Sequence, residues 1–258
     1  MAHADGRAAG RSRRERNPVG VRVRRPYGGG MSAGIVASVN LGRLRRNPSD
    51  PRIWTGIDKQ PTADAVDVRS PGPQDVGAGS GLVGDEIGNH DVHGGDDQAV
   101  YAVAREDLDH FAAILGRPLD PGSFGENLTL EGYDVNDARV GERWRIGDTL
   151  ELQVTDPRIP CNTFRAHIAE QGWLRTFTLE ARPGTYLRVL TPGSVRAGDP
   201  LVVTHRPDHD ITVATVFRAL TTERDLLPSL LAAGDDLTDG VRELAESRAE
   251  LELDRDPD

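Results

Sequence analysis

The chain has 258 residues, a length that suits one sizeable hydrophobic core with a smaller unit appended to it. Its net charge of -10 argues against a nucleic-acid partner, because binding to phosphate backbones depends on clustered cations. No stretch approaches the roughly 18 apolar residues that would span a bilayer, so the composition also argues against membrane insertion.

Residues 1–30 form an arginine-rich leader with eight arginines, two acidic residues and a run of three glycines at its end. The leader lacks the apolar region of about 7 to 15 residues that a secretory signal requires. Its composition predicts a disordered segment, or a start assigned too early, with Met31 as the natural first residue. A basic arm that binds a partner is the alternative.

The next part of the chain alternates short strands with loops. Residues 33–40 are rich in Val and Ile and predict a buried strand. Residues 41–98 contain many Gly, Pro and Asp residues, with one short strand predicted over 65–69. Residues 105–115 place apolar side chains at helical spacing, so they predict a helix, which Gly116 ends.

Three further strands are predicted after this helix. Residues 148–156 alternate strictly between apolar and polar side chains, which is typical of a half-buried strand. Residues 186–191 and 201–204 are two more strands, with turn signals between them. Several short strands with only one clear helix predict a mainly β fold with helices, α+β in class, built as a barrel or closed sheet.

The C-terminal part of the chain predicts a small helical unit. Thr222 and Thr238 are the expected helix N-caps, and the acidic end, residues 253–258, is expected to be frayed. We therefore expect a main domain over residues 31–206 and a three-helix unit over residues 207–258. The three expected helices cover residues 213–220, 226–233 and 241–251.

The chain contains one cysteine, Cys161. A single cysteine forms no intramolecular disulfide, so nothing requires an oxidising compartment and the cytoplasm is the expected location. Cys161 follows a strand end in a loop stiffened by Pro157 and Pro160. A thiolate there is a soft metal ligand, and the nearby Arg158 would stabilise its anionic form. A buried structural cysteine is the alternative.

Four local patterns occur in a fixed order: TGIDK at 55–59, VHGG at 92–95, SFGENLT at 123–129 and PRIPC at 157–161. Together they resemble the MOSC domain, named for the C-terminal domain of molybdenum-cofactor sulfurase, and in particular its YiiM-like bacterial branch. The C-terminal unit resembles the three-helix extension of that branch. The resemblance implies a MOSC-type β-barrel and a molybdenum cofactor (molybdopterin) whose metal is bound by Cys161.

The four patterns contain further residues suited to a pterin cofactor. Lys59 and Arg158 would hold its phosphate, because Arg grips phosphate with two hydrogen bonds and Lys supplies a compact charge. Solvated surface charge is the alternative for both. His93 is followed by Gly94, so its imidazole and the adjacent amides are placed to meet a pterin or phosphate group. A histidine that only bonds a backbone carbonyl is the alternative.

The SFGENLT pattern offers short polar groups to a ligand. Asn127 and Thr129 are expected to contact the cofactor, while the role of Glu126 stays open. The alternative is a turn in which these side chains satisfy their own backbone. One departure from the family is Asn89, where members of this branch commonly carry an aspartate. If that carboxylate acts in catalysis or orients the histidine, either the activity is altered or Asp91 substitutes for it.

The resemblance implies an oxidoreductase that reduces small N-hydroxylated compounds, with Cys161 as metal ligand and catalytic residue. The sequence has no cysteine cluster for an iron-sulfur centre and no GxGxxG fingerprint, so a separate protein is expected to donate the electrons. Two alternatives remain. One is a non-catalytic carrier of the cofactor, or of sulfur as a Cys161 persulfide. The other is a thiol hydrolase with His93 as base, which requires the two side chains within about 3 to 4 Å.

Overall fold

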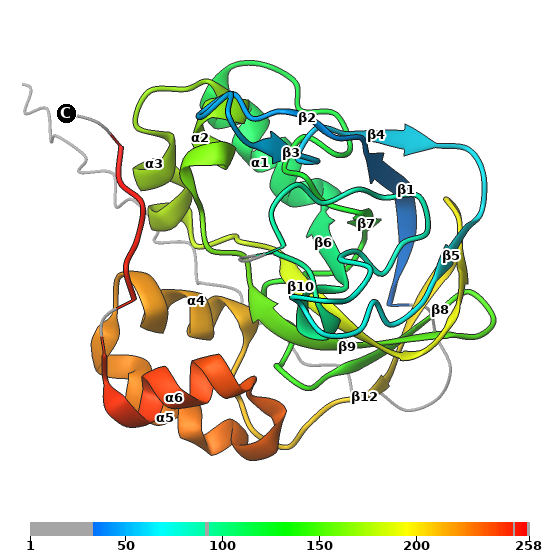
Figure 1. The fold of residues 1–258 in the computed structure, drawn as a ribbon. Helices are drawn as coiled ribbons and strands as arrows, with labels where there is room; N and C mark the ends of the chain where they lie inside the picture. Colours follow the sequence, from blue (N-terminus) through cyan, green and yellow to red (C-terminus); the bar gives the residue numbers. More distant parts are fainter. Residues whose placement is uncertain (1–32, 91–92, 250, 257–258) are drawn as a thin grey trace, which may run out of the picture. The chain divides into compact units, whose positions relative to one another are not determined.

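The computed structural model describes residues 33–90, 93–249 and 251–256 (Figure 1). Contacts within the chain divide it into residues 1–30 and residues 31–258, and every described residue belongs to the second unit. The expected disordered leader and the expected start at Met31 lie outside the described residues.

The larger part of the second unit is a closed β-barrel. Its strands, with one strand that extends the sheet, are β1 (Gly34–Gly42), β4 (Lys59–Thr62), β6 (Val100–Ala104), β7 (Leu128–Glu131), β8 (Arg143–Ile146), β9 (Leu150–Pro157), β10 (Thr185–Thr191) and β12 (Pro200–His205). The strands pair in the order β12-β8-β9-β10-β6-β7-β1, and the pairing of β1 with β12 closes the ring. β4 pairs with β1 outside this ring. Closure removes exposed sheet edges within the ring, and the expected barrel is confirmed.

The barrel interior is filled by apolar side chains that alternate along the strands. Leu150, Leu152 and Val154 of β9 are completely buried, which confirms the alternation predicted for that strand. The strands predicted at the positions of β1, β10 and β12 are confirmed as well. Two small antiparallel pairs add to the fold: β2 (Arg45–Arg46) with β3 (Trp54–Thr55), and β5 (Val66–Val68) with β11 (Gly193–Val195).

Three helices lie beside the barrel and share one aromatic cluster: α1 (Arg105–Leu115), α2 (Asn162–Ile168) and α3 (Trp173–Glu180). The helix predicted from apolar spacing is α1, and Gly116 ends it in the left-handed conformation as expected. The sequence did not predict α2 or α3, because both are short and neither has a side-chain cap from its own N-cap residue. Six fully buried rings form the cluster: Phe111, Phe124, Phe164, Trp173, Phe177 and Phe217.

The C-terminal unit contains α4 (Val213–Thr221), α5 (Leu227–Leu230) and α6 (Asp239–Ser247). Two 3-10 segments, Arg224–Leu226 and Leu231–Asp236, flank α5, so the second predicted helix is broken rather than continuous. Leu227, Leu230 and other apolar side chains give these helices a core of their own. None of the helices in the described part of the chain is long and apolar enough to cross a membrane.

The predicted helix caps are partly wrong. Thr222 is the residue that follows α4 rather than the N-cap of a helix. Thr238 stands at the N-cap position of α6, but its hydroxyl donates to the carboxylate of Asp156 instead of capping the helix. The side-chain cap of α4 is Thr212, which accepts a hydrogen bond from the backbone N–H of Thr215 at 3.2 Å.

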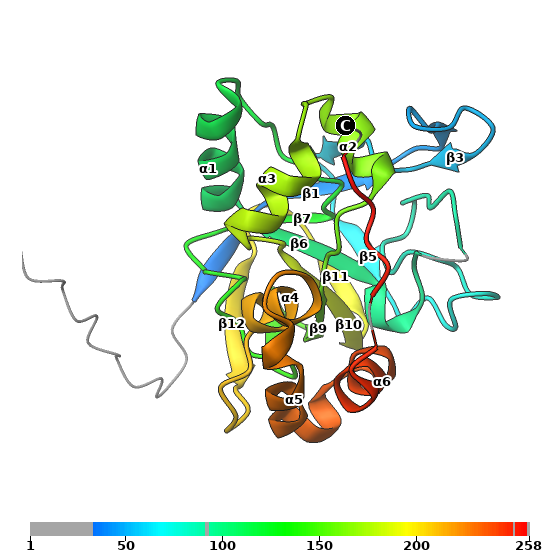
Figure 2. The same cartoon turned by 90° about the vertical axis from the view of Figure 1, so that its left-hand side faces the viewer.

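The prediction of a frayed acidic end is wrong for residues 253–256, the part of it that the structure describes. Figure 2 shows this segment running from α6 towards α2. The carboxylate of Asp254 accepts a hydrogen bond from the backbone N–H of Asn162 at 2.7 Å. Asp256 accepts from the backbone N–H groups of Leu174 at 3.3 Å and Arg175 at 3.0 Å. The segment therefore caps the first turns of α2 and α3.

Candidate functional site

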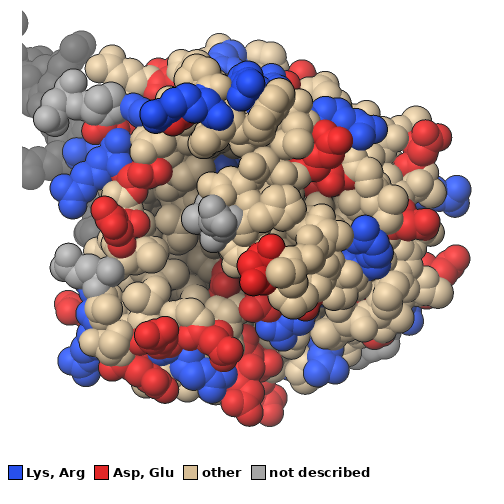
Figure 3. Space-filling model, viewed as in Figure 1, with Lys and Arg blue, Asp and Glu red and all other residues tan. Residues whose placement is uncertain are grey.

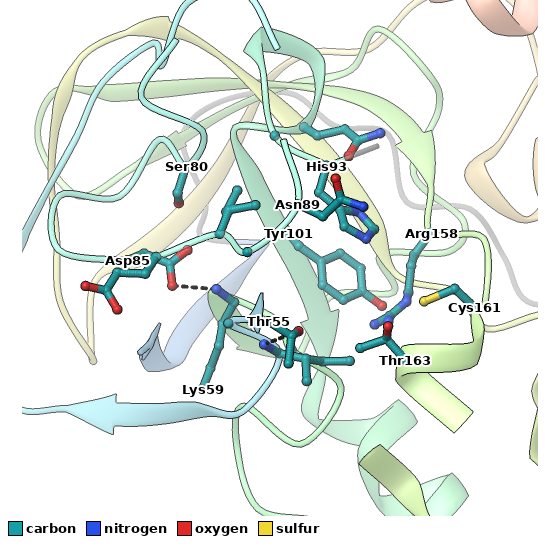
Figure 4. A pocket seen from close by; sticks show the side chains of 18 of the residues that line it. Thr55, Lys59, Ser80, Asp85, Asn89, His93, Tyr101, Arg158, Cys161 and Thr163 are labelled. Atoms are coloured by element: carbon teal, nitrogen blue, oxygen red, sulfur yellow. Dashed lines mark hydrogen bonds and ion pairs between the residues drawn. The ribbon is translucent and has the colours of Figure 1, made fainter. Parts of the chain in front are cut away.

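A cavity of about 350 Å³ opens beside Cys161, which is within the usual size range of small-ligand sites. Figure 4 places Cys161, Arg158 and Thr163 on one side, with Lys59 and Asp85 opposite and Tyr101 between them. All four sequence patterns contribute to its walls. The expected site residues that line it are Lys59, His93, Gly94, Asn127, Arg158 and Cys161.

Cys161 is the residue that precedes the first turn of α2. Its backbone is extended, and its carbonyl accepts the N–H of Arg165 at 3.0 Å, so the start of the helix fixes the position of the side chain. The cysteine is a free thiol, half-buried against the aromatic cluster. The PRIPC loop therefore presents the only sulfur nucleophile of the chain at the cavity wall.

Arg158 contributes a buried positive charge to the same wall, with only 6% of the residue exposed. Its guanidinium carbon lies 3.9 Å from the ring centre of Phe164 and 5.4 Å from that of Tyr101. One guanidinium nitrogen donates to the backbone carbonyl of Phe124. No Asp or Glu among the described residues forms an ion pair with Arg158, so its charge is available to an anionic ligand.

Lys59 is placed differently, because its charge is neutralised within the protein. Its ammonium group pairs with Asp85, and the two side chains are only 8% and 1% exposed. Asp85 also accepts from the backbone N–H of Gly42 at 2.7 Å and from the amide of Asn127 at 2.9 Å. The sequence did not indicate Asp85, since no local pattern links it to a lysine 26 residues away.

The SFGENLT pattern folds into a buried hydrogen-bond network. Asn127 accepts the N–H of Tyr101 at 3.2 Å, which fixes the face that it turns to the cavity. Thr129 donates to Glu126 at 2.9 Å and accepts from Asn40 at 3.1 Å. Thr129 is fully buried in this network and is not part of the cavity wall, so the structure gives no support to its expected contact with a cofactor.

Glu126 belongs to the framework of the loop rather than to the cavity. Its two carboxylate oxygens accept the backbone N–H groups of Gly122 at 2.6 Å and Phe124 at 2.9 Å. Burial raises the pKa of this carboxyl, while the backbone N–H groups lower it. These bonds hold the loop that carries Gly125 against Ile57 on the cavity wall.

His93 lies on the cavity wall between the two cationic side chains (Figure 4). Burial, with the charges of Arg158 and Lys59, lowers its pKa to about 4, so the imidazole is neutral at physiological pH. Gly94 has a φ of 86°, and a Cβ there would lie 2.7 Å from the carbonyl oxygen of Gly79. Only glycine fits at this point, which explains the HGG pattern locally.

Two other expectations concern this region: a thiol hydrolase that uses Cys161 and His93, and the effect of Asn89 in place of an aspartate. The described hydrogen bonds include none between Cys161 and His93, so the thiol hydrolase gains no support. Asn89 lines the cavity where the family commonly has an aspartate, and Asp91 lies outside the described residues. Among the described residues no group of three or more His, Cys, Asp or Glu side chains is arranged to hold a metal ion.

Sequence reasoning missed several residues of the cavity wall. Tyr101 and Tyr186 pack with ring centres 5.0 Å apart and form the apolar floor, and the hydroxyl of Tyr101 donates to the carbonyl of Pro183 at 2.6 Å. Aromatic residues at strand positions predict only core packing, so no sequence pattern marked these two as site residues. Trp54 and Asp254 also line the cavity, from segments that are far from Cys161 in the sequence.

Comparison with known proteins decides the family. Residues 89–202 match the family model described as the MOSC domain. The uncharacterized protein YflK of Bacillus subtilis is 31% identical over 183 residues, which cover 69% of this chain and 76% of YflK. The chain belongs to the MOSC family. The resemblance of the four sequence patterns is thereby confirmed.

Two further proteins are similar to this MOSC protein, one in structure and one in sequence. The crystal structure of YiiM from Geobacillus stearothermophilus superposes with a TM-score of 0.66 at 27% identity, covering 83% of this chain and 98% of that one. A protein of Gibberella moniliformis named reductase is 27% identical over 223 residues. That match covers 83% of the MOSC chain but 37% of the fungal protein, so the chain spans little more than a third of it.

Proposed function

We propose that this MOSC protein binds a molybdenum cofactor and reduces small N-hydroxylated compounds. The observation that carries the proposal is the position of Cys161, a free thiol on the wall of a ligand-sized cavity that also contains the buried charge of Arg158. The name of the fungal relative, a reductase, favours a redox role over a purely structural one.

The residues of the cavity fit a pterin cofactor. The thiolate of Cys161 is a soft ligand suited to molybdenum. Arg158 would hold the phosphate group, because its guanidinium has free N–H donors and no carboxylate partner among the described residues. Asn127 and the neutral His93 would bond to polar edges of the pterin, and the close contact of Gly94 with Gly79 holds the segment that carries His93 in place. Lys59 would contribute hydrogen bonds rather than net charge, since Asp85 neutralises it.

The chemistry divides between the cofactor and the chain. When bound, the cofactor supplies a metal that removes the oxygen atom of an N–OH group in a two-electron step. The chain would orient the substrate and keep water out through Tyr101 and Tyr186, while Arg158 keeps a positive charge close to the cysteine. A separate donor protein would restore the two electrons, and two protons complete the conversion of the N–OH compound to the amine and water.

Metal analysis tests the proposal first. The protein is purified from a host that makes the cofactor, and molybdenum per chain is measured by mass spectrometry for wild type, Cys161→Ala and Arg158→Met. We expect close to one molybdenum per chain in wild type, almost none in Cys161→Ala and a reduced content in Arg158→Met. Asp67→Asn, which changes an exposed carboxylate on β5, serves as the control and should match wild type.

Turnover separates the enzyme from a carrier. Wild-type protein that contains molybdenum should reduce a hydroxylamine with an artificial reductant, and Cys161→Ala should not. Stable molybdenum binding without turnover would instead favour a cofactor carrier. Well-folded wild-type protein that contains no molybdenum would contradict the proposal and favour a sulfur carrier that acts through a Cys161 persulfide.

A further inference from the structure

A second cavity, of about 560 Å³, lies between the barrel and the C-terminal helices. Its walls come from the segment 93–98, the end of β9, and α4 and α6. Four residues line both this cavity and the one beside Cys161, so the two cavities adjoin: His93, Gly94, Gln98 and Tyr186. Figure 3 shows this face of the molecule hollowed, with acidic side chains along the lower rim of the hollow.

The charged groups of the second cavity are all acidic. Asp96, Asp97 and Asp156 line it, and none of its described lining residues is Lys or Arg. Two of the three carboxylates already have strong partners. Asp97 forms an ion pair with Arg188, and Asp96 accepts from the Ser70 hydroxyl and a backbone N–H.

Asp156 is the carboxylate that is left for a ligand. The hydroxyl of Thr238 donates to its two oxygens at 2.9 and 3.0 Å, and no Lys or Arg among the described residues forms an ion pair with it. A second acceptor lies in the region that both cavities share. The amide oxygen of Gln98 is buried and has no hydrogen-bond partner among the described residues. A buried acceptor without a donor is costly unless a ligand or water supplies one.

The rest of the lining is largely apolar. Side chains from α4, from α6 and from the segments that follow β9 and α6 make up this part, together with the ring of Tyr186. The apolar side chains are Ile159, Leu220, Val241, Leu244 and Leu251. An apolar wall with one carboxylate and one free amide oxygen suits an organic molecule with a positively charged end and a hydrocarbon end.

The two adjoining cavities therefore differ in charge. The cavity beside Cys161 contains the positive charge of Arg158, and its carboxylates Asp85, Glu86 and Asp254 already accept bonds within the protein. The second cavity contains carboxylates and no Lys or Arg among its described lining residues. The second cavity would therefore favour a cationic ligand over an anionic one, because its charged groups are all acidic.

We infer that the second cavity binds a small amphipathic organic cation, held by Asp156 and Gln98 at its charged end and by α4 and α6 at its apolar end. The support for this binding comes from the residues that line the second cavity and does not depend on the proposed function. The further identification of the cation with the substrate rests on the proposed function, and it narrows the substrates to N-hydroxylated compounds that carry both a positive charge and an apolar group.

The protonation of Asp156 gives the binding a pH dependence. Burial raises the pKa of this carboxyl to about 7; the bond from Thr238 and the charge of Arg188 lower it, and Asp97 raises it. His93, which also faces the cavity, is neutral in this range because its pKa is about 4, and Tyr186 and Asp96 complete the titratable lining. A ligand that stays cationic should therefore bind more tightly at pH 8 than at pH 6.

Calorimetric titration of the full-length protein with three probes of similar size tests the inference. The probes are benzylamine (a cation), benzyl alcohol (neutral) and benzoate (an anion). We expect benzylamine to bind more tightly than benzyl alcohol, and any binding of benzoate to be independent of Asp156. Asp156→Asn should weaken benzylamine at least tenfold, equivalent to about 1.4 kcal/mol, without weakening benzyl alcohol. Asp148→Asn, an exposed carboxylate next to the other end of β9, should change nothing.

A second variant keeps the test decisive if Asp156→Asn folds poorly. Gly240 lies in α6 and lines the cavity, and a Cβ built there meets no atom within 4 Å. Gly240→Leu should therefore fold, since leucine also favours a helix, and it should weaken the binding of benzylamine and benzyl alcohol by filling the cavity. Benzylamine that binds no more tightly than benzyl alcohol, or benzylamine binding that neither variant weakens, would overturn the inference.

Molybdenum measured in the same preparations separates this inference from the proposed function. Asp156-dependent binding of benzylamine to protein without molybdenum would leave the cation site standing and remove the proposed enzyme. Molybdenum-containing protein that turns over a hydroxylamine but does not bind benzylamine would support the proposed enzyme and contradict the cation site.

Discussion

Lys59 and Asp85 form an ion pair that is almost completely removed from water, and three different donors converge on the Asp85 carboxylate. A buried pair contributes little net stability, but the loss of one partner leaves a charge buried without compensation. The pair therefore holds β4 and the loop that carries Asp85 together on the cavity wall.

We expect Asp85→Asn to lower the free energy of unfolding by about 3 kcal/mol, the scale measured when one partner of a buried pair is removed. The double variant Lys59→Met, Asp85→Asn should lose less than the sum of the two single variants, because no unpaired charge remains. Denaturant unfolding measures all three, and Asp67→Asn on β5 is the exposed control. A loss in Asp85→Asn as small as in this control would contradict the prediction.

His93 provides a second test at the scale of single residues, through the pH dependence of the free energy of unfolding. Its folded pKa is about 4 against an ordinary value of 6.5, so the unfolded chain binds more protons in this interval. The stability that neutral His93 permits is present above pH 6.5 and is lost as the pH falls through 4, by up to about 3 kcal/mol. His93→Gln should remove this loss, and a ring-proton NMR titration should place the midpoint near pH 4.

The raised pKa of Asp156 has the opposite effect on the pH dependence of stability, in an overlapping pH range. Its folded pKa is raised to about 7 from 3.8, so the stability from its retained proton is complete below pH 3.8 and is lost as the pH rises through 7. Asp156→Asn should consequently make stability rise more steeply between pH 4 and 7, whereas His93→Gln makes it flatter. If the two variants changed the slope in the same direction, one of the two pKa shifts would have the wrong sign.

At the scale of elements, α2 and α3 depend on caps that are remote in the sequence. Asp254 and Asp256 accept the first free N–H groups of the two helices, and neither N-cap residue supplies a side-chain bond. Negative charge at a helix N-terminus is also favourable for the helix dipole. The C-terminal segment thereby stabilises the helix that begins next to Cys161.

We expect Asp254→Ala and Asp256→Ala each to lower the unfolding free energy by about 1 kcal/mol, the usual effect of losing a cap. The rate of backbone hydrogen exchange should rise at Asn162 in the first variant and at Arg175 in the second, because each N–H loses its acceptor. Glu252→Ala is the control within the same exposed segment. Unchanged exchange at both positions would show that the segment does not cap these helices in solution.

At the scale of the whole described unit, Phe217 links the C-terminal helices to the barrel. It belongs to α4 but lies in the aromatic cluster of α1 to α3, with its ring centre 6.2 Å from that of Phe177. The ring is completely buried. Barrel and helices therefore share a core, and we expect them to unfold together.

Phe217→Ala should cost about 3 to 5 kcal/mol, since it removes a fully buried ring and leaves a cavity. Wild type should show one cooperative transition, with the same midpoint by tryptophan fluorescence and by far-ultraviolet circular dichroism. Leu231→Ala, at a side chain that is 41% exposed, is the matched control and should cost less than 1 kcal/mol. Separate transitions for wild type by the two probes would contradict a shared core.

The sequence by itself determined the features that depend on near neighbours. The alternation of β9, the apolar spacing of α1 with Gly116 at its end, and the PRIPC loop around Cys161 are all visible locally, because strand and helix periods of 2 and 3.6 residues relate positions only a few apart. The four patterns also predicted the family and six residues of the cavity wall.

The tertiary structure decided the contacts between distant positions. Asp85 neutralises a lysine 26 residues away, Thr238 donates to a carboxylate 82 residues away, and Asp254 caps a helix that begins 92 residues before it. No local period encodes such pairs, because they exist only after barrel closure brings the loops and the C-terminal segment together. The electrostatics of both cavities, the partners of their charges and the caps of α2 and α3 were set at that step.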